Sequence, residues 1–396
     1  MVVHSYYPAD PRVRREAEAL VGDGWSVDVV CLRSKGELAT EDCGGVRVYR
    51  LPVRRHRGGG LAVYLLEYAA FFALASLWIV RLHLRRRYDV LQAHNMPDFL
   101  VFTGLIPRLL GARVVLDIHD LVPELYSLRF GAGTRHPVVE LTRWVERLSV
   151  AFADHVVTAG EPFRRRLVEA GAPPAKVSVV MNSADPGLFR PVGADGAGKG
   201  GNGHFRLVYH GGLFERYGLD VAIKAVGRLR EAIPGLSFDI YGEGEALADL
   251  ARLVRELGLS ARVRLRGYVP IDQIPGAVAT ADLGVVPYRR NHFNDLLYPT
   301  KAFEYIALGV PVIVSRTAAV AALFAAVPEM FFEPDDVDGL AARILALYRE
   351  PEQRERVRLA ASAAYSPHAW DSQRRRYVAL MRRLAAPERP SAAERD

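Results

Sequence analysis

Short apolar runs alternate with longer amphipathic segments along most of the chain, a pattern typical of parallel sheets with helical crossovers. In the first half, the runs that predict strands are residues 1–5, 27–32, 46–49, 89–93, 113–118, 155–158 and 177–181. In the second half, they are residues 206–210, 237–241, 262–267, 283–287, 310–314 and 330–332. The pattern predicts two α/β domains of the doubly wound, Rossmann-like type, with the carboxyl ends of their strands facing a cleft.

Local signals predict helix starts and domain boundaries. Asp10 followed by Pro11 is typical of a helix N-cap, so a helix is predicted to begin there. Glycines crowd residues 186–204, where apolar side chains are too few to pack a core, and this indicates a linker. The first domain is therefore expected over residues 1–185 and the second over residues 205–366.

The composition is that of a globular chain. Of 396 residues, 50% are hydrophobic and 24% are charged, which excludes a disordered protein. Cys31 and Cys43 are the only cysteines, so neither a zinc site nor a disulfide framework is expected. The opening residues turn polar after Val3, which predicts no signal peptide and a cytoplasmic protein. The polar residues 386–396 are expected to fray.

Residues 61–80 form an apolar stretch flanked by arginines that is long enough for a transmembrane helix. A crossing there would separate the strands at 27–32 and 46–49 from the strand at 89–93 by a bilayer. One parallel sheet cannot be divided in that way. Glu67 within the stretch adds a further cost. A buried or surface-lying helix is therefore predicted.

Positive charge is concentrated in one part of the sequence. The formal net charge is +7, and residues 47–87 contain nine arginines against a single acid, Glu67. Such a segment suits nucleic acid, an anionic membrane surface or plain solvent. Charge alone leaves the three alternatives open.

Two loops that follow predicted strands carry glycines and polar groups. Gly211 and Gly212 come directly after one strand, with Arg216 close behind, and Gly242 and Glu243 come after the next. A strand–glycine–helix turn presents free backbone amides to an anion. Taken alone, the same residues also fit an ordinary turn with a solvated arginine.

The stretch YPTKAFEYIALGVPVIVS places Lys301 and Glu304 on one face of a helix start, just before a buried strand. Together with the glycine loops it predicts a site for a nucleoside diphosphate. A carboxylate only accepts hydrogen bonds, so Glu304 is expected to bind the ribose diol. Lys301 and Arg216 are expected to neutralise the phosphates, and the base is expected to lie against Tyr268 and Val269. The alternative is a surface ion pair between Lys301 and Glu304, worth roughly 0.3 kcal/mol.

Four segments are together similar to the signatures of family-4 retaining glycosyltransferases, which have the GT-B fold. They are LDIHDLVPELY, HGGLFERYGLD, GYVPIDQIPGAVATADLGVVPY and FEYIALGVPVIVS. The likeness covers nearly the whole chain and includes MNSADPGLFRP and SPHAWDSQRRRYVALM. It implies transfer of a hexose-type sugar from a UDP- or GDP-sugar to a glycan or polyprenyl-linked acceptor. It also implies that a helix at about residues 367–385 completes the first domain.

The resemblance implies roles for individual residues. Glu304 matches the glutamate that binds the donor ribose, and Thr300 lies in PTKAFEY, which resembles a subgroup with a lysine in this motif. His119 matches the histidine that contacts the donor sugar, and Asp120 and Glu124 are expected to orient His119 or the acceptor. The expected catalytic residues are His119, Asp120, Arg216, Lys301 and Glu304. The expected donor-binding residues are Gly211, Gly212, Arg216, Gly242, Glu243, Tyr268, Val269, Thr300, Lys301 and Glu304.

The chain departs from the family pattern at several positions. The first motif glutamate falls on Leu296, and the arginine and lysine of the glycine turn fall on Gly212 and Tyr217. Arg216 is then the cation left in that turn. The alternative enzymes on this architecture are a nucleotide-sugar epimerase, which needs acids and histidines around the sugar in both domains, and a phosphorylase, which needs a cofactor lysine in a larger chain; the sequence shows neither set. The departures at Leu296 and Tyr217 keep open a non-catalytic basic scaffold for membrane or nucleic acid.

No cofactor or metal is expected. Asp335, Asp336 and Asp338 imitate a D-x-D metal motif, but an amphipathic segment follows them, so a helix N-cap is predicted. Side-chain donors and a helix terminus are expected to stabilise the negative charge on the leaving diphosphate. The basic segment is assigned to an anionic membrane surface, with no nucleic acid as partner. This predicts a peripheral protein at the inner face of the plasma membrane.

Overall fold

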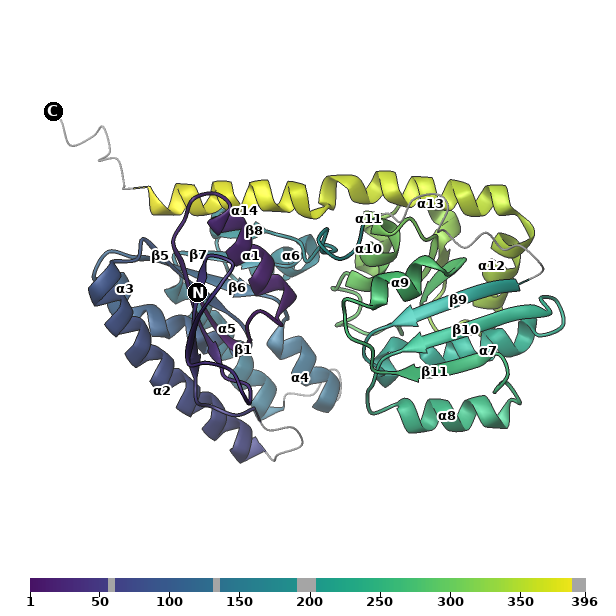
Figure 1. The fold of residues 1–396 in the computed structure, drawn as a ribbon, viewed down its shortest axis with the longest axis horizontal. Helices are drawn as coiled ribbons and strands as arrows, with labels where there is room; N and C mark the ends of the chain where they lie inside the picture. Colours follow the sequence, from purple (N-terminus) through teal and green to yellow (C-terminus); the bar gives the residue numbers. More distant parts are fainter. Residues whose placement is uncertain (56–60, 131–135, 191–203, 387–396) are drawn as a thin grey trace. The chain divides into compact units, whose positions relative to one another are not determined.

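The computed structural model describes residues 1–55, 61–130, 136–190 and 204–386. The chain divides into two compact units, residues 1–182 with 371–396, and residues 183–370. Most of the predicted linker and all but the first residue of the predicted tail lie outside the described residues. Each unit has helices on both faces of a largely parallel sheet (Figure 1), so the predicted α/β class with two doubly wound units is confirmed.

Within the described residues of the first unit, eight strands form one sheet in the order β3-β4-β2-β1-β5-β6-β7-β8. The strands are β1 (Val2–Tyr6), β2 (Val27–Leu32), β3 (Thr40–Cys43), β4 (Val46–Leu51), β5 (Val90–His94), β6 (Arg113–Ile118), β7 (His155–Thr158) and β8 (Val177–Val179). The helices are α1 (Pro11–Val21), α2 (Leu61–Arg86), η1 (Asp98–Gly104), α3 (Leu105–Leu109), α4 (Val122–Phe130), α5 (Pro137–Phe152), α6 (Glu161–Glu169), η2 (Pro174–Lys176) and α14 (Trp370–Ala385).

The direction of each crossover decides which face of this sheet a helix covers. The chain moves one way from β1 through α1 to β2, and the opposite way from β4 through α2 to β5. Because parallel crossovers are right-handed, α1 and α2 cover opposite faces. Figure 1 shows α14 on the side of α1. There Tyr377 of α14 donates a 2.5 Å hydrogen bond to Gln92 of β5.

Strand β3 was not predicted from the sequence. It pairs antiparallel with β4, and three of its four residues are exposed, so it lacks the apolar pattern of the other strands. Gly44 and Gly45 connect the two strands with φ of 64° and 87°. Two consecutive residues with positive φ are typical of a tight hairpin turn. The Gly-Gly pair was therefore the signal that could have revealed this edge strand.

Helix α1 begins as predicted. The carboxylate of Asp10 accepts hydrogen bonds from the backbone amides of Arg12 and Val13, each 3.2 Å long. These bonds satisfy amides that have no partner within the helix.

Helix α2 contains the predicted apolar helix and extends it to Arg86. Val63–Arg86 is the one helix in the described part of the chain that could cross a membrane, judged by length and composition. Phe71, Ala75 and Ile79 are buried, and the helix packs on β1, β2 and β4. Because β4 and β5 belong to one sheet, α2 lies on the surface of that sheet, as predicted.

The second unit has a fully parallel sheet. Among its described residues the strand order is β11-β10-β9-β12-β13-β14. The strands are β9 (His204–His210), β10 (Gly235–Tyr241), β11 (Val263–Gly267), β12 (Leu283–Val286), β13 (Val312–Ser315) and β14 (Phe331–Phe332). The helices are η3 (Glu215–Tyr217), α7 (Leu219–Leu229), α8 (Leu247–Glu256), α9 (Ile274–Ala279), α10 (Thr300–Ala307), α11 (Ala318–Leu323), η4 (Pro328–Met330), α12 (Val337–Arg349), α13 (Pro351–Tyr365) and η5 (Ser366–His368).

Candidate active site

The predicted site residues form two groups, one in each unit. His119 and Asp120 follow β6 in the first unit. In the second unit the glycine loops follow β9 and β10, Tyr268 follows β11, and Lys301 and Glu304 lie on α10. Parallel strands end at the same edge of a sheet, and doubly wound proteins bind ligands at that edge.

The glycines of the second unit allow its loops to pack closely. Gly211 has φ of 120°, and a Cβ there would lie 3.0 Å from Cε of Lys301. Gly242 has φ of 140°, and its Cβ would lie 1.9 Å from the carbonyl oxygen of Gly211. The amide of Gly242 donates to the carbonyl oxygen of Gly267 at 2.7 Å. The loops after β9, β10 and β11 therefore stack on one another, and the first of them lies against the lysine.

Lys301 is buried in a cage of three tyrosines. Its Nζ donates a 2.6 Å hydrogen bond to the hydroxyl of Tyr288. The same atom lies 4.6–4.7 Å from the ring centroids of Tyr209, Tyr217 and Tyr288. Aromatic ring faces attract an ammonium group. Among the described residues no carboxylate lies within ion-pair distance of this ammonium, so the Tyr288 hydroxyl and the neighbouring rings are what stabilise the buried cation.

The charge of Lys301 is nonetheless costly. Burial lowers the pKa of its ammonium from 10.5 to about 7, with Glu304 opposing the shift and Arg216 adding to it. A lysine with this pKa is about half protonated near neutral pH. An anionic ligand would restore the charge fully, because it favours the protonated form.

Glu304 is bound by a histidine that sequence reasoning missed. Nε2 of His210, at the end of β9, lies 2.6 Å from Oε2 of Glu304. Within the described structure, no ion pair of 4.0 Å or less joins Lys301 to Glu304, although they lie one helical turn apart. The alternative of a surface ion pair between them is therefore wrong.

Arg216 stacks against aromatic rings beside the lysine. Its guanidinium carbon lies 4.6 Å from the ring centroid of Phe214 and 4.8 Å from that of Tyr217. Its Nη2 donates to the Tyr217 hydroxyl at 3.3 Å. Its Nε is buried and has no hydrogen-bond partner among the described residues. Buried donors are nearly always paired in folded proteins, so this one is suited to a ligand.

The remaining predicted donor-binding residues lie at the same edge of the sheet and are more exposed to solvent than Lys301. Tyr268 is 68% exposed, and Glu243 is also exposed. Gly212, Val269 and Thr300 are half-buried. Tyr268 and Val269 follow β11, as the predicted position for the base requires.

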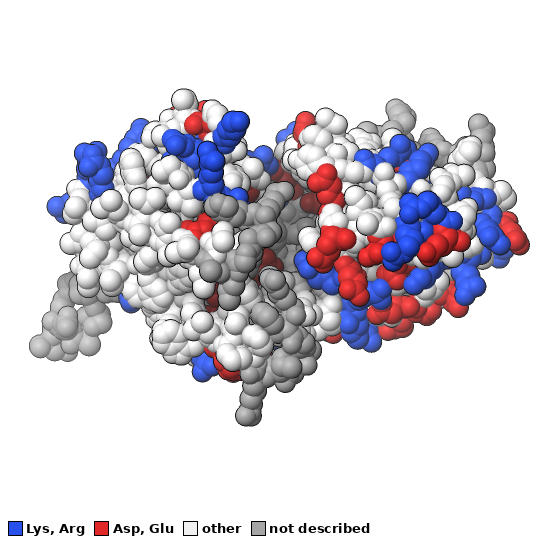
Figure 2. Space-filling model, turned by 90° about the horizontal axis from the view of Figure 1, so that it is seen from below, with Lys and Arg blue, Asp and Glu red and all other residues white. Residues whose placement is uncertain are grey.

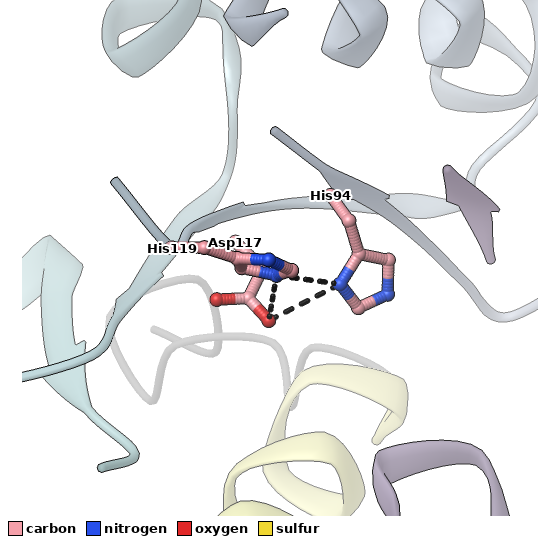
Figure 3. A group of neighbouring side chains, drawn as sticks. All are labelled: His94, Asp117 and His119. Atoms are coloured by element: carbon pink, nitrogen blue, oxygen red, sulfur yellow. Dashed lines mark hydrogen bonds and ion pairs between the residues drawn. The ribbon is translucent and has the colours of Figure 1, made fainter. Parts of the chain in front are cut away.

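In the first unit, His119 belongs to a cluster with His94 and Asp117 (Figure 3). Nε2 of His119 lies 3.1 Å from Nδ1 of His94 and 3.4 Å from Oδ2 of Asp117. Burial lowers the pKa of His94 to about 4, so its ring is neutral. Glu124, expected to orient His119 or the acceptor, instead accepts a 2.5 Å hydrogen bond from Arg166. Asp117 and His94 orient the ring in its place.

The ligand atoms of His94, Asp117 and His119 lie within 4.8 Å of one another, close enough to be considered as a metal site. Both oxygens of Asp117 accept hydrogen bonds from the guanidinium of Arg12, at 2.7 and 3.0 Å. Burial by itself would raise the pKa of Asp117, but Arg12 and the histidines outweigh it and keep that pKa well below its usual value. A cation already occupies this carboxylate, so the cluster fits a hydrogen-bond network better than a divalent ion.

The aspartates that resemble a D-x-D metal motif form the predicted helix cap. Asp336 accepts a 2.8 Å hydrogen bond from the amide of Gly339 at the start of α12. Asp335 pairs with Arg289. The aspartates are thus engaged by the protein itself, in the way the following amphipathic segment indicates.

The site residues missed by sequence reasoning share a simple signal. His94 and His210 are the last residues of β5 and β9, and Asp117 is the penultimate residue of β6. All three are polar and buried at the carboxyl end of an apolar strand. That position is where ligands bind in doubly wound proteins, so each could have been singled out on this ground.

Comparison with known proteins identifies the family and the fold. The glycosyl transferase 4-like domain family matches residues 9–183, and the glycosyl transferases group 1 family matches residues 204–350. The two matches follow one another along the chain and together cover every described strand except β1. The protein is therefore an enzyme of the glycosyltransferase class. More narrowly, it is a GT4-type glycosyltransferase with the GT-B fold.

Curated relatives have low sequence identity to this chain, but their alignments extend over most of both proteins. The 2-deoxystreptamine glucosyltransferase of Streptomyces kanamyceticus is 25% identical over 356 residues, which cover 87% of this chain and 84% of that protein. The D-inositol 3-phosphate glycosyltransferase of Thermomonospora curvata is 29% identical over 310 residues, 72% and 69% of the two chains.

Solved structures share the fold at lower identity. Sucrose-phosphate synthase from Thermosynechococcus elongatus superimposes with a TM-score of 0.77 at 18% identity, over 97% of this chain and 95% of that chain. Anabaena HepE in complex with UDP-glucose superimposes with a TM-score of 0.68 at 16% identity, over 96% and 98%.

Proposed function

We propose that this enzyme transfers a hexose-type sugar from a nucleoside diphosphate donor to a glycan or lipid-linked acceptor, with retention of the anomeric configuration. The observation that carries the proposal is the cluster of Lys301, Arg216 and Glu304 around the Gly211 loop. It combines two cations with one acceptor-only group, which matches two phosphates and a ribose diol. The likeness of the chain's fold to that of HepE, whose structure is in complex with UDP-glucose, supports a nucleotide sugar as donor.

Each charged group has a defined task in this proposal. The buried Nε of Arg216, which has no partner among the described residues, donates to a phosphate oxygen. The ammonium of Lys301 stabilises the same diphosphate from its tyrosine cage. Glu304 accepts hydrogen bonds from the ribose hydroxyls. The base lies along Tyr268 and Val269.

The transfer breaks the bond between the anomeric carbon and the diphosphate oxygen, and the bonding electrons leave with the diphosphate. A new bond forms between the anomeric carbon and an acceptor hydroxyl oxygen, whose proton passes to the departing phosphate oxygen. Negative charge therefore develops on the diphosphate, where Arg216 and Lys301 stabilise it. His119 is assigned to the donor sugar, on the resemblance to the family.

Donor hydrolysis tests the proposal. We expect slow release of nucleoside diphosphate from one of a panel of UDP-, GDP- and ADP-sugars, and a loss of about 10- to 150-fold in donor affinity in Glu304→Ala. Glu231→Ala, at a 91% exposed side chain in the same unit, is the control and leaves affinity unchanged. Interconversion of sugars without release of the nucleotide would favour an epimerase. Absence of binding to every donor would favour a non-catalytic scaffold.

We further propose that the first unit works at an anionic membrane surface. Its support is an exposed apolar face on α2 and α3: Leu66 is 72% exposed, Leu77 66%, Leu84 65% and Leu109 74%. In Figure 2 the visible face of this unit is largely uncharged, with Lys and Arg gathered at part of its rim. Apolar patches of this kind mark interaction sites.

The charges beside these leucines favour a membrane over a second copy of the chain. Arg81, Arg85 and Arg87 are exposed at the end of α2 and just beyond it, and Glu67, the one acid of α2, is buried against His4 at 3.1 Å. A self-complementary dimer through this face would bring arginines together. Anionic lipid instead attracts each arginine by about 1 kcal/mol near the surface.

Vesicle flotation tests this proposal. The wild type is expected to float with vesicles containing anionic lipid and to dissociate as salt rises. The variant Leu77→Ser with Leu84→Ser, and separately Arg81→Glu with Arg85→Glu, should bind several-fold more weakly. Leu359→Ser, at a 54% exposed leucine of the second unit, is the matched control. Vesicle binding that is unchanged in these variants would contradict the membrane assignment. So would a dimer of the wild type in solution that the same substitutions disrupt.

A further inference from the structure

Lys301 and Glu304 lie one helical turn apart with opposite charges, yet they do not form an ion pair. Each charge favours the other, because Glu304 raises the pKa of Lys301. Direct pairing would leave neither charge available to a ligand. Lys301 instead donates to Tyr288, and Glu304 is bound by His210. The carboxylate is therefore bound by a partner from strand β9 rather than by the lysine of its own helix.

The hydrogen bonds around His210 determine its tautomer. The backbone amide of His210 donates to the hydroxyl oxygen of Tyr305 at 3.0 Å. Nδ1 of His210 lies 3.1 Å from the same oxygen. A carboxylate oxygen only accepts hydrogen bonds, so Nε2 of His210 carries a proton and donates it to Oε2 of Glu304. Nδ1 then accepts the hydroxyl proton of Tyr305, and the hydrogen bonds run from Tyr305 through His210 to Glu304. Burial raises the pKa of Tyr305, which keeps the phenol protonated.

The surrounding fold fixes both rings. A Cβ at Gly284 of β12 would lie 2.4 Å from Cδ2 of Tyr305, so this strand glycine makes room for the ring. On the other side, Phe189 stacks on the His210 ring with centroids 6.3 Å apart and an angle of 24°. His210 itself is 5% exposed. The hydrogen-bonded chain from Tyr305 to Glu304 is therefore held on several sides.

We propose that His210 is a positioning residue for Glu304: its Nε2 proton, held between the Tyr305 hydroxyl on one side and the carboxylate on the other, anchors Oε2 and directs the remaining acceptor sites of the carboxylate to the hydroxyls of the ligand. The inference rests on the proposed function, because it concerns the ribose of the donor. A fixed acceptor-only group discriminates against a ligand that lacks a hydroxyl, because the half-buried carboxylate, whose side chain is 17% exposed, then loses a donor for one of its lone pairs. The site should therefore prefer ribonucleotides to 2′-deoxyribonucleotides, and His210 should be needed for that preference.

The test compares the affinity of UDP with that of 2′-deoxy-UDP, and of GDP with 2′-deoxy-GDP, by calorimetry. For the wild type we expect the nucleotide that binds to be preferred over its deoxy form by about 10- to 150-fold, the range of one charge-assisted hydrogen bond. His210→Leu should reduce the ratio to a few-fold. His210→Gln, whose amide nitrogen can donate from the position of Nε2, should restore most of it.

A matched control separates positioning from general loss of stability. His155 is likewise a buried strand histidine, in the first unit, bonded to Ser178 at 2.8 Å. His155→Leu should lower the melting temperature in the same way as His210→Leu and keep the full ribose preference. Full preference in His210→Leu would overturn the positioning role while leaving the proposed function intact. A wild type that binds no nucleotide would overturn both.

A direct measurement needs no ligand. Long-range proton–nitrogen NMR spectra report which ring nitrogen of His210 carries the proton. The proton is expected on Nε2 in the wild type, and Tyr305→Phe should produce a mixture of tautomers or a protonated ring. A wild-type ring protonated on Nδ1 would contradict the assignment, whatever the nucleotide data show.

Discussion

Removing the charge of Lys301 should change how both nucleotide binding and stability depend on pH. The variant is Lys301→Met, which keeps an unbranched chain in the cage of Tyr209, Tyr217 and Tyr288. The ammonium has a pKa of about 7 without ligand because burial disfavours its charge. A bound diphosphate favours the protonated form, so binding above pH 7 must take up a proton.

The magnitude follows from that pKa. If only the protonated form binds the diphosphate, the wild-type Kd increases about 50-fold between pH 7 and pH 9, or about 2.3 kcal/mol. Tyr209 and Tyr288 do not titrate in this window, because burial raises their pKa values well above 10. In Lys301→Met the affinity should be lower at pH 7 and nearly independent of pH.

Stability without ligand should change in the opposite direction. The pKa of Lys301 is lower in the folded state than its unfolded value of 10.5, so the unfolded chain binds more protons between pH 7 and pH 10.5. The free energy of unfolding of the wild type therefore rises with pH in this window, by about 2 kcal/mol from pH 7 to pH 9 relative to Lys301→Met.

Calorimetry of UDP and GDP in buffers of different ionisation enthalpy measures the proton uptake directly. Urea denaturation at pH 7 and pH 9 measures the stability change. Two results would refute the reasoning. One is wild-type nucleotide binding that takes up no proton at pH 8. The other is a nucleotide affinity of Lys301→Met that falls with pH as steeply as that of the wild type. Either result would mean that the ammonium does not contact the diphosphate.

Three further predictions address packing, capping and the first unit. Gly242→Ala should lower the melting temperature strongly and abolish nucleotide stabilisation, because its Cβ would meet backbone at 1.9 Å; Gly276→Ala, with open space around it, should change neither. Asp336→Ala should cost about 1 kcal/mol of stability, with donor turnover unaffected by chelators, and any dependence of metal response on this residue would contradict a helix cap. Asp117→Asn should destabilise the protein by about 1–3 kcal/mol in urea, because the buried Arg12 loses one carboxylate partner and keeps Glu16 at 3.3 Å, and nucleotide binding by the remaining folded protein should be unchanged.

The order of strands and helices could be predicted from the sequence because the signals are local. Buried parallel strands read as apolar runs, and helix caps depend on residues two or three positions away, as at Asp10 and Asp336. The edge strand β3 escaped because it is polar and its stability comes from pairing with β4. The shared helical face of Lys301 and Glu304 was also a local inference.

The partners of those two residues were decided by the tertiary structure. Tyr209 and His210 come from β9, Tyr217 from η3 and Tyr288 from the loop after β12, so as many as 94 positions separate the contacting residues. Helical periodicity extends over three or four residues and cannot say which strand ends meet. Only the order β10-β9-β12-β13 brings these side chains together. The sequence by itself placed a cation and an acid side by side; the sheet decided that each would bind a different group.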